Sequence, residues 1–317
     1  MDLPTEFRLN NGLSVPAVGL GTFQGNEGNS RVKEAVLLAL KLGYRHIDGA
    51  NAYGNERAIG EAIKESGIPR QEVFVTSKLA QTWHEPRDVE KALEVSLKDL
   101  QLDYVPHAYK AGESNATIRH PSGNGKPVID FDLSRRYTET WQAMEKLVDS
   151  GKARSIGLSN FNILKTKRVI EIARIIPAVN QVELHPYLPQ HELLKFSQDH
   201  GILLMAHQPL GGRPVGVVRA HTDVEYPTEH SKIFVQVCLA WAVQRGVPVV
   251  PKSVQEHHMI QNLQLKRLSQ EYFDIVDNLS KERGDIRFLN PTPHLGFDIF
   301  DEERDQPVES KAPWDSE

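Results

Sequence analysis

Three side chains in the first quarter of the chain could together carry out proton transfer. Residues 43–56, GYRHIDGANAYGNE, begin with a glycine suited to ending a helix, pass through a short apolar strand and place Asp48 and Tyr53 on the loop that follows. A second expected strand, residues 73–78, ends on Lys78 after an almost uncharged run, where an ammonium group needs a partner. Asp48 is a candidate for that partner.

If these three side chains converge, Lys78 stands between a carboxylate that keeps it charged and a phenol whose ionised form it favours. The pKa of the Tyr53 phenol, normally near 10, would then fall, and the phenol could act as a general acid near neutral pH. The alternative is structural: Asp48 caps the following helix, Tyr53 packs, and the Lys78 amine reaches water. Spacing alone favours the structural alternative.

The composition fits a single globular domain. The chain has 317 residues, and about 250 are typical of one (β/α)8 barrel. Its 39% hydrophobic and 25% charged residues allow a large core. A formal charge of -5 argues against a nucleic-acid partner. Cys238 has no second cysteine to pair with, and no apolar run is long enough to cross a bilayer, so we expect a cytoplasmic protein without a membrane partner.

Short apolar runs alternate with helical periodicity along the chain. After a β-hairpin expected in residues 7–15, such runs occupy residues 18–22, 44–47, 73–78, 152–159, 178–184, 202–206 and 247–250. Helical spacing follows most of them, for example over 56–64, 87–100 and 234–243. At this length the alternation predicts a (β/α)8 barrel. We expect one domain, 1–317, with a hairpin in 1–16 and a loop and acidic tail in 284–317.

The segment around Asp48 and Tyr53, taken with Lys78, resembles the aldo-keto reductase superfamily, whose members hold an Asp, Tyr, Lys and His tetrad in an eight-stranded α/β barrel. The resemblance covers nearly the whole chain from Phe7 to Phe300 and is greatest to fungal members of the glycerol dehydrogenase and aldose reductase type. It implies interconversion of an aldehyde or ketone with an alcohol by hydride transfer from a nicotinamide cofactor. Tyr53 would supply the proton, helped by Lys78 and Asp48.

The same resemblance implies a cofactor site at the ends of several strands. Ser159, Asn160 and Gln181 are similar to the side chains that hydrogen-bond the nicotinamide carboxamide. His207, in the run HQPLG, stands where the family has a tyrosine that stacks on the nicotinamide. The full set of implied cofactor contacts is Thr22, Asp48, Ser159, Asn160, Gln181, His207, Gln208, Leu210, Lys252, Ser253, His258 and Asn262.

The run Pro251 to Val254 resembles the family segment that grips the adenosine 2'-phosphate, and Lys252 and Ser253 suit a dianionic phosphate. Where the family has the next arginine of this segment, this chain has His258. A histidine with a pKa near 6.5 is mostly uncharged at pH 7, so we expect weaker binding of the 2'-phosphate. Asn262 matches the adenine contact. These residues favour NADPH over NADH. A Rossmann motif is excluded, because the third glycine after Gly19-Leu20-Gly21 is absent.

Aromatic residues are expected to wall the substrate pocket. Phe23 stands where many family members have a pocket tryptophan, and Trp83 and His84 lie in the loop after Lys78. The histidines beside Asp48 and at 257–258 lack the companion ligands and spacing of a strong metal site, so no metal is expected.

The sequence departs from the family pattern after Val105. Relatives continue there with an apolar strand ending in His-Trp-Pro, whose histidine orients the substrate carbonyl, whereas this chain jumps to Pro106-His107. About five or six residues are absent. His107 lies about four positions closer to Val105 than the family's histidine would, and at about 3.3 Å per residue it falls about 13 Å short. A second shortening follows His230. We therefore expect an incomplete fourth strand, a shortened seventh helical connection, lowered stability and slow turnover.

Two interpretations of the function remain at this point. The first is an NADPH-dependent reductase of reduced activity, and the second is a weakly active or inactive NADP-binding protein. The residues identify neither the substrate nor the oligomeric state.

Overall fold

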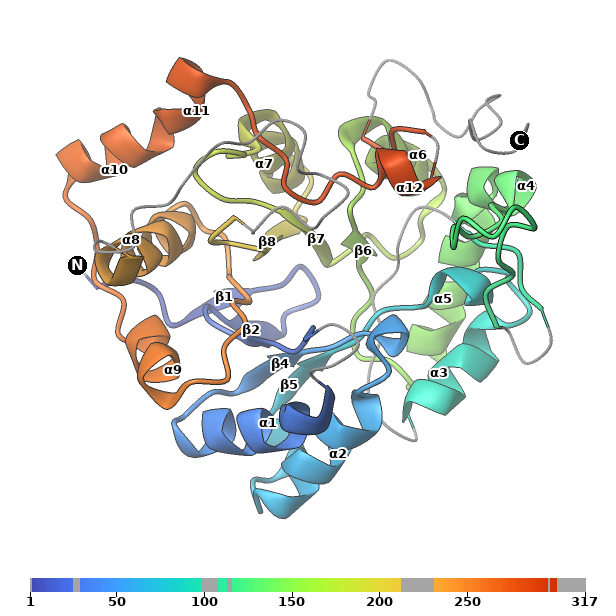
Figure 1. Ribbon diagram of the computed structural model, residues 1–317, viewed down its shortest axis with the longest axis horizontal. Coiled ribbons are helices and arrows are strands. Elements are labelled where there is room, and N and C mark those ends of the chain that lie inside the picture. Colours follow the sequence, from blue (N-terminus) through green and yellow to red (C-terminus); the bar gives the residue numbers. More distant parts are fainter. Residues whose placement is uncertain are drawn as a thin grey trace.

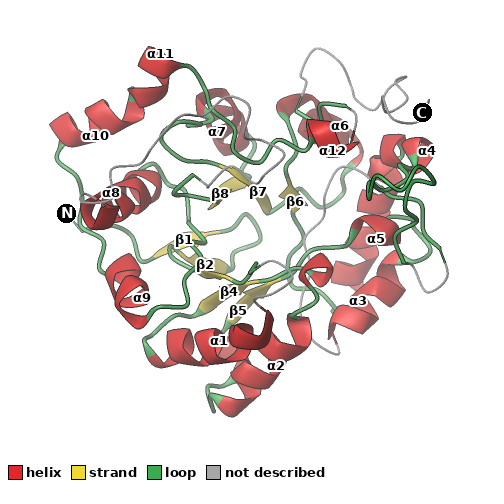
Figure 2. Ribbon diagram, viewed as in Figure 1, coloured by secondary structure: helices red, strands yellow, loops and turns green. Residues whose placement is uncertain are grey.

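The computed structural model describes residues 2–24, 29–97, 108–112, 116–211, 231–295 and 297–300. Short strands occupy the middle of the molecule and helices surround them (Figure 1). The two kinds of element alternate along the chain, as the sequence predicts (Figure 2). The strands are β1 Glu6–Arg8, β2 Ser14–Pro16, β3 Leu20–Gly21, β4 His46–Asp48, β5 Phe74–Thr76, β6 Leu158–Ser159, β7 Val179–Glu183 and β8 Leu203–His207.

Parallel pairing joins the strands into two groups. The orders are β3-β4-β5 and β6-β7-β8. The segment around Val249 connects them, because it forms parallel bridges to Val18 beside β3 and to Ala206 in β8. The two groups thus form one curved sheet. Among the described residues β5 and β6 share no ladder, and the expected fourth strand, near residues 100–105, lies outside the described part of the chain.

Helices follow the strands and cover the outside of this sheet (Figure 1). The α-helices are α1 Val32–Lys41, α2 Glu56–Glu65, α3 Val89–Leu97, α4 Phe131–Arg135, α5 Tyr137–Asp149, α6 Ile163–Ile172, α7 His191–Asp199, α8 Ser231–Gln244, α9 Glu256–Leu263, α10 Gln270–Asp277, α11 Leu279–Arg283 and α12 Thr292–Leu295. The 3-10 helices are η1 Asn29–Arg31, η2 Asn51–Tyr53, η3 Arg70–Glu72 and η4 Gln81–Trp83.

The N-terminal hairpin closes one end of the sheet. Strands β1 and β2 pair antiparallel around a turn in which Gly12 has a φ of 85°, a conformation that glycine adopts without strain. Val15 is fully buried and packs in one cluster with Val179, Met205 and Val250 from the barrel strands. The expected hairpin is therefore present, and its apolar face covers the amino ends of the strands.

The hydrophobic core lies between the helices and the strands, as the periodic spacing of apolar residues in the helices predicts. In α1 the apolar residues Val32, Val36, Ala39 and Leu40 recur three or four positions apart, and all are buried. Cys238 is buried and unpaired in α8, as expected for core filling. Over the part of the chain that is described, no helix combines the length and apolarity that a membrane span requires.

Two local predictions are wrong. Ser30 stands just before the first helical run in the sequence, and serine at that point predicts an N-cap. In the structure Ser30 lies within η1, and the N-cap residue of α1 is Arg31, which makes no side-chain capping bond. A turn of 3-10 helix often precedes an α-helix and takes over this role. Residues 247–250 form isolated parallel bridges instead of a regular strand. The acidic tail from 301 to 317 lies outside the described residues.

Candidate active site

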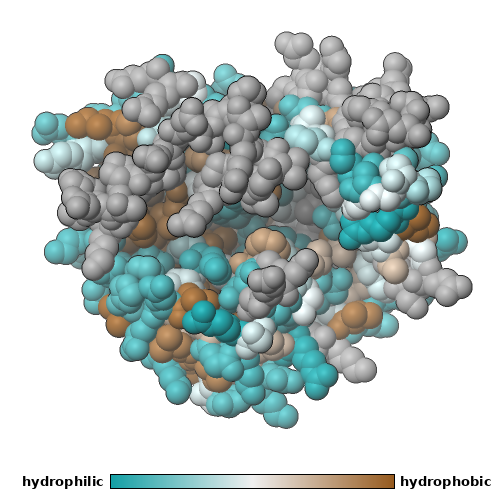
Figure 3. Space-filling model, in the orientation of Figure 1, coloured by the Kyte–Doolittle hydropathy of each residue, from teal (hydrophilic) through white to brown (hydrophobic). Residues whose placement is uncertain are grey.

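A cavity of about 390 Å³ opens where the parallel strands end at their carboxyl side. Asp48, Ser159 and His207 are the last residues of β4, β6 and β8, and Lys78 follows β5 by two positions. The cavity is lined by Gly21, Thr22, Phe23, Asp48, Ala50, Ala52, Tyr53, Lys78, Leu79, Gln81, Ser159, Asn160, Gln181, His207, Gln208, Pro209, Leu210, Gly211, Val250, Pro251, Lys252 and Leu289. In the view of Figure 3 the molecule's face is largely hydrophilic over α1 and α2, with hydrophobic residues showing toward the middle.

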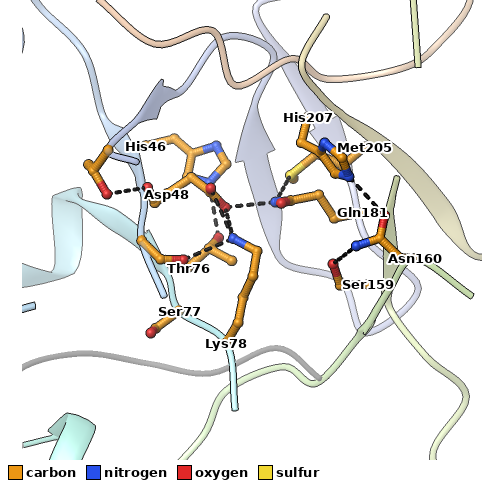
Figure 4. Close-up of polar contacts among 12 residues, drawn as sticks. His46, Asp48, Thr76, Ser77, Lys78, Ser159, Asn160, Gln181, Met205 and His207 are labelled. Carbon is orange, nitrogen blue, oxygen red and sulfur yellow. Dashed lines mark hydrogen bonds and ion pairs between the residues drawn. The ribbon is translucent and has the colours of Figure 1, made fainter. Parts of the chain in front are cut away.

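Asp48 and Lys78 form a buried ion pair in this cavity. The Nζ atom of Lys78 lies 2.9 Å from Oδ1 and 3.0 Å from Oδ2 of Asp48, and it also donates to the backbone oxygen of Gly49. Both side chains are less than a tenth exposed. The predicted pairing of Lys78 with Asp48 is thus present in the structure (Figure 4). Helix α2 has Asn55 at its N-cap position, so the alternative in which Asp48 caps that helix is wrong.

Tyr53 lies beside this pair. It ends η2, and its backbone oxygen accepts a hydrogen bond of 2.9 Å from Asn29 Nδ2. The Nζ atom of Lys78 is 5.6 Å from the centre of the Tyr53 ring, and the ring of Phe23 is 5.0 Å away on a tilted plane. The three side chains proposed for proton transfer therefore share one cavity.

The direction of the Tyr53 pKa corrects the sequence-based expectation. Desolvation raises the pKa of the Tyr53 phenol above its ordinary value of 10.0, and this effect outweighs the lowering by the Lys78 charge. Asp48 adds a smaller raising effect. The expectation considered only the lysine, because the burial of Tyr53 cannot be deduced from spacing. The phenol is consequently held in its protonated form at neutral pH, which is the form that donates a proton.

Amide groups occupy the wall opposite Lys78. Gln181 Nε2 donates to Asp48 Oδ1 at 2.7 Å, and the backbone nitrogen of Asn160 donates to the backbone oxygen of Gln181 at 2.9 Å. Asn160 adopts a positive φ of 60° and Gln208 one of 46°, a region that few non-glycine residues enter. Such strained positions cluster at ligand sites. Figure 4 shows the Gln181 amide directed at Asp48, with Asn160 beside Ser159 and His207.

His207 belongs to the same wall. Its Nε2 atom is 2.8 Å from Asn160 Oδ1. Burial lowers the pKa of His207 to about 4; the charge of Lys78 also lowers it, while that of Glu183 acts in the opposite direction. At neutral pH the ring is therefore uncharged, so it contributes a flat, neutral surface to the cavity.

Two residues at the site, Glu183 and Leu289, were not predicted from the sequence. Glu183 is 1% exposed, and its two oxygens accept backbone hydrogen bonds from Phe288 at 2.6 Å and from Leu289 at 2.8 Å. It thereby attaches the C-terminal segment to the end of β7, and Leu289 lines the cavity. Burial acts to raise the pKa of Glu183, but hydrogen bonding and charge from His185 lower it overall. A carboxylate ending an apolar strand was the available signal for this contact.

Five sequence-predicted site residues do not line the cavity. Trp83 packs against the core cluster that contains Leu79, and His84 is only 2% exposed in the same region. Ser253 bonds with the backbone of Gln255, His258 is exposed on α9, and Asn262 is buried in that helix.

His107 and His120 follow the point in the sequence where the family's histidine is missing. His107 lies outside the described residues. His120 is partly exposed, bonds with Ser122 and does not line the cavity. In the described part of the chain, no group of three or more His, Cys, Asp or Glu is arranged to hold a metal ion.

Helices surround the parallel strands, and an ion-paired lysine, a tyrosine and several amides lie at the carboxyl ends of the strands. This arrangement is that of an α/β-barrel enzyme, whose active site lies at that end of the strands. Comparison with known proteins agrees with this class. Residues 17–281 match the model described as "Aldo/keto reductase family". The chain therefore belongs to the aldo/keto reductase family.

Individual relatives support this assignment. Aldo-keto reductase family 1 member A1 of Xenopus tropicalis is 42% identical over 295 residues, which span 86% of this chain and 88% of the relative. Glycerol 2-dehydrogenase (NADP(+)) of Saccharomyces cerevisiae is 38% identical over 305 residues, or 92% and 96% of the two chains. Aldehyde reductase YPR1 of the same yeast is 36% identical over 294 residues, or 89% and 93%.

Family membership confirms three sequence-based predictions: the (β/α)8 fold class, the resemblance to aldo-keto reductases and an oxidoreductase that interconverts carbonyl and alcohol groups. NADP as the cofactor also agrees with the family. The comparisons give no support to the alternative of a binding protein without catalysis.

Proposed function

We propose that this protein reduces a small aldehyde or ketone with NADPH and that Tyr53 donates the proton to the carbonyl oxygen. The observation that carries the proposal is the buried ion pair of Lys78 and Asp48 beside Tyr53 in one cavity. A protonated phenol next to a fixed cation can release its proton and leave a phenolate that the cation stabilises.

Each member of the trio has a separate role in this proposal. Tyr53 holds the transferable proton on its hydroxyl oxygen. Lys78 is fixed by three hydrogen bonds to Asp48 and Gly49, so its charge cannot move away as the phenolate develops. Asp48 orients Lys78 and also accepts from Gln181. Preorganised charge of this kind is a large part of catalysis in enclosed sites.

The cavity wall fits a nicotinamide group. When bound, NADPH supplies the hydride that is added to the carbonyl carbon. Asn160, Gln181 and Gln208 place three amides on the wall, and Gln208 Oε1 is buried without a hydrogen-bond partner among the described residues. A buried acceptor in that condition is suited to the amide of a ligand. Ser159, Thr22, His207 and Leu210 complete the proposed cofactor wall.

We propose a preference for NADPH over NADH because of Lys252. This lysine is exposed and lines the cavity, and no ion pair joins it to another described residue. A free ammonium group attracts a dianionic phosphate, which NADPH carries and NADH lacks. His258 and Ser253, on the same stretch of chain, are the proposed further contacts, and Asn262 is the proposed adenine contact.

The substrate class follows from the cavity and the relatives. Phe23, Leu79 and Leu289 give it an apolar lining near Tyr53. The printed names of the yeast relatives refer to glycerol and to aldehydes. We therefore propose short aldehydes, including hydroxylated ones, as substrates. The cytoplasmic location, the single domain and the slow turnover expected from the sequence remain predictions.

Cofactor titration followed by single turnover tests this proposal. Quenching of protein fluorescence measures the binding of NADPH and NADH, and absorbance at the nicotinamide band follows hydride transfer to glyceraldehyde, benzaldehyde and a ketone. We expect NADPH to bind more tightly and to be oxidised by at least one aldehyde. Lys252→Met should weaken NADPH about tenfold without affecting NADH, whereas Lys146→Met, on exposed α5 surface, should change neither. Binding without hydride transfer to any carbonyl would refute the proposal.

A further inference from the structure

Glu56, the first residue of α2, is a buried carboxylate outside the cavity. It is 6% exposed. Its Oε1 atom accepts a hydrogen bond of 2.5 Å from Ser77 Oγ. Its Oε2 atom accepts one of 2.9 Å from Asn51 Nδ2 and one of 3.0 Å from Ser96 Oγ. One carboxylate therefore joins η2, the end of β5, helix α3 and the start of α2.

No cation in the described part of the chain explains why this carboxylate is buried. Among the described residues, no lysine, arginine or histidine forms an ion pair with Glu56. Burial of an unpaired carboxylate is unfavourable unless hydrogen bonds compensate it. Three side-chain donors and the positive end of α2 provide that compensation. These hydrogen bonds consequently fix how η2, the end of β5, α3 and the start of α2 are arranged around Glu56.

Those donors are adjacent to the proton-transfer residues. Asn51 begins the 3-10 turn that Tyr53 ends, and Ser77 directly precedes Lys78. The backbone nitrogen of Asn51 also donates to the backbone oxygen of Lys78 at 3.2 Å. Glu56 thus joins the 3-10 turn that carries the Tyr53 phenol to the end of the strand that carries the Lys78 ammonium group, and it does so from outside the cavity.

We infer that Glu56 is a positioning residue that fixes Tyr53 relative to the Lys78 and Asp48 pair. The inference rests on the proposed function, since it assigns Glu56 a part in the same proton transfer. Glu56 does not line the cavity, so it touches neither substrate nor cofactor and acts only through Asn51 and Ser77. Misplacement of a reacting group by about 1 Å can lower a rate about a hundredfold.

Two substitutions separate the acceptor role of Glu56 from its charge. Glu56→Ala removes all three acceptor contacts. Glu56→Gln retains most of them, because its amide oxygen can accept from Asn51 and Ser96, while its amide nitrogen can donate to the Ser77 hydroxyl. We expect Glu56→Ala to lower kcat about a hundredfold with the Kd for NADPH changed less than about threefold. Glu56→Gln should restore most of the loss.

A double-mutant cycle with Tyr53→Phe shows whether Glu56 acts through the phenol. In a background that lacks the phenol, Glu56→Ala should have almost no further effect on single-turnover hydride transfer, because the group it positions is gone. Glu61→Ala, on the exposed face of the same helix, is the matched control and should retain the wild-type rate. Where Glu56→Ala fails to fold, Asn51→Ala removes the contact on the Tyr53 side alone.

The outcomes distinguish this inference from the proposed function. If Tyr53→Phe is fully active, both are wrong. If Tyr53→Phe is inactive but Glu56→Ala has the wild-type rate, or if the two effects simply add, the proposed function stands and the positioning role of Glu56 is refuted. A lowered melting temperature with an unchanged rate per folded molecule would give Glu56 a purely structural role and would also refute it.

Discussion

The side chains of Asp48 and Gln181 are in contact across the cavity, with 2.7 Å between Asp48 Oδ1 and Gln181 Nε2, although 133 residues separate them in the chain. A carboxylate can only accept hydrogen bonds, so this contact turns the amide nitrogen of Gln181 toward Asp48 and leaves its oxygen for other partners. The residue that orients Lys78 therefore also orients a residue proposed to hold the nicotinamide carboxamide.

Asp48→Asn should disturb both residues that Asp48 orients, Lys78 and Gln181. The introduced amide nitrogen would face either the Lys78 ammonium group or Gln181 Nε2, and each of these is itself a donor. Either Lys78 would have to move away, or the Gln181 amide would have to turn over and present the opposite group to the cofactor. Lys78 would lose its buried ion pair with the Asp48 carboxylate. We expect weaker NADPH binding, slower turnover and a free energy of unfolding lower by about 3 kcal/mol. Fluorescence titration and denaturant unfolding measure these changes; unaltered NADPH affinity would contradict the shared role.

Glu183→Gln should loosen the C-terminal segment. A glutamine has one acceptor oxygen, whereas Phe288 and Leu289 donate to separate oxygens of Glu183. One backbone N–H would lose its partner, at a cost of about 1–3 kcal/mol. We expect hydrogen exchange of these two amides to accelerate about tenfold, since about 1.4 kcal/mol corresponds to that factor. Glu192→Gln, on the exposed start of α7, is the control; equal protection in both variants would disprove the anchoring role.

Stability should fall as the pH is lowered below about 6.5. Burial lowers the pKa of His46 to about 4, and its Nδ1 atom has no hydrogen-bond partner among the described residues. As the pH falls, the histidine in the unfolded chain is therefore protonated first. The contribution of His46 to the free energy of unfolding is fully present above the pKa of the unfolded state, near 6.5, and is lost as the pH falls toward the pKa of the folded state. Between pH 7 and pH 5 this histidine should contribute a loss of about 2 kcal/mol.

Denaturant unfolding of the wild type and of His46→Gln at both pH values checks this expectation. The glutamine variant has no titrating ring at this position, so its stability should change less between pH 7 and pH 5. An equal change in both proteins would show that His46 does not account for the acid sensitivity.

Local patterns predicted the site better than they predicted its energetics. Spacing alone did not favour a shared site, but the run around Asp48 and Tyr53, taken with Lys78 and the family resemblance, correctly predicted that all three lie in one cavity. Adjacent parallel strands end at the same edge, which brings these side chains together. Contacts between residues far apart in the chain could not be predicted from local sequence patterns. Glu56 and Glu183 act through partners far along the chain, and the burial that reverses the expected pKa shift of Tyr53 depends on the packing of several elements.

The predictions for the loop after Lys78 were less accurate. Trp83 and His84 follow Lys78 closely in sequence, but η4 turns them into the core and away from the cavity. The direction that a loop side chain takes is set by the helices that pack on it, and no short motif encodes that direction.

The central claim is that Tyr53 supplies the proton, and single-turnover hydride transfer by Tyr53→Phe tests it most directly. Wild type and variant are saturated with NADPH and mixed with the same aldehyde, and oxidation of the cofactor is followed. We predict that the variant binds NADPH like the wild type and transfers hydride about 10² to 10⁴ times more slowly. Equal rates in the two proteins would contradict the role assigned to Tyr53.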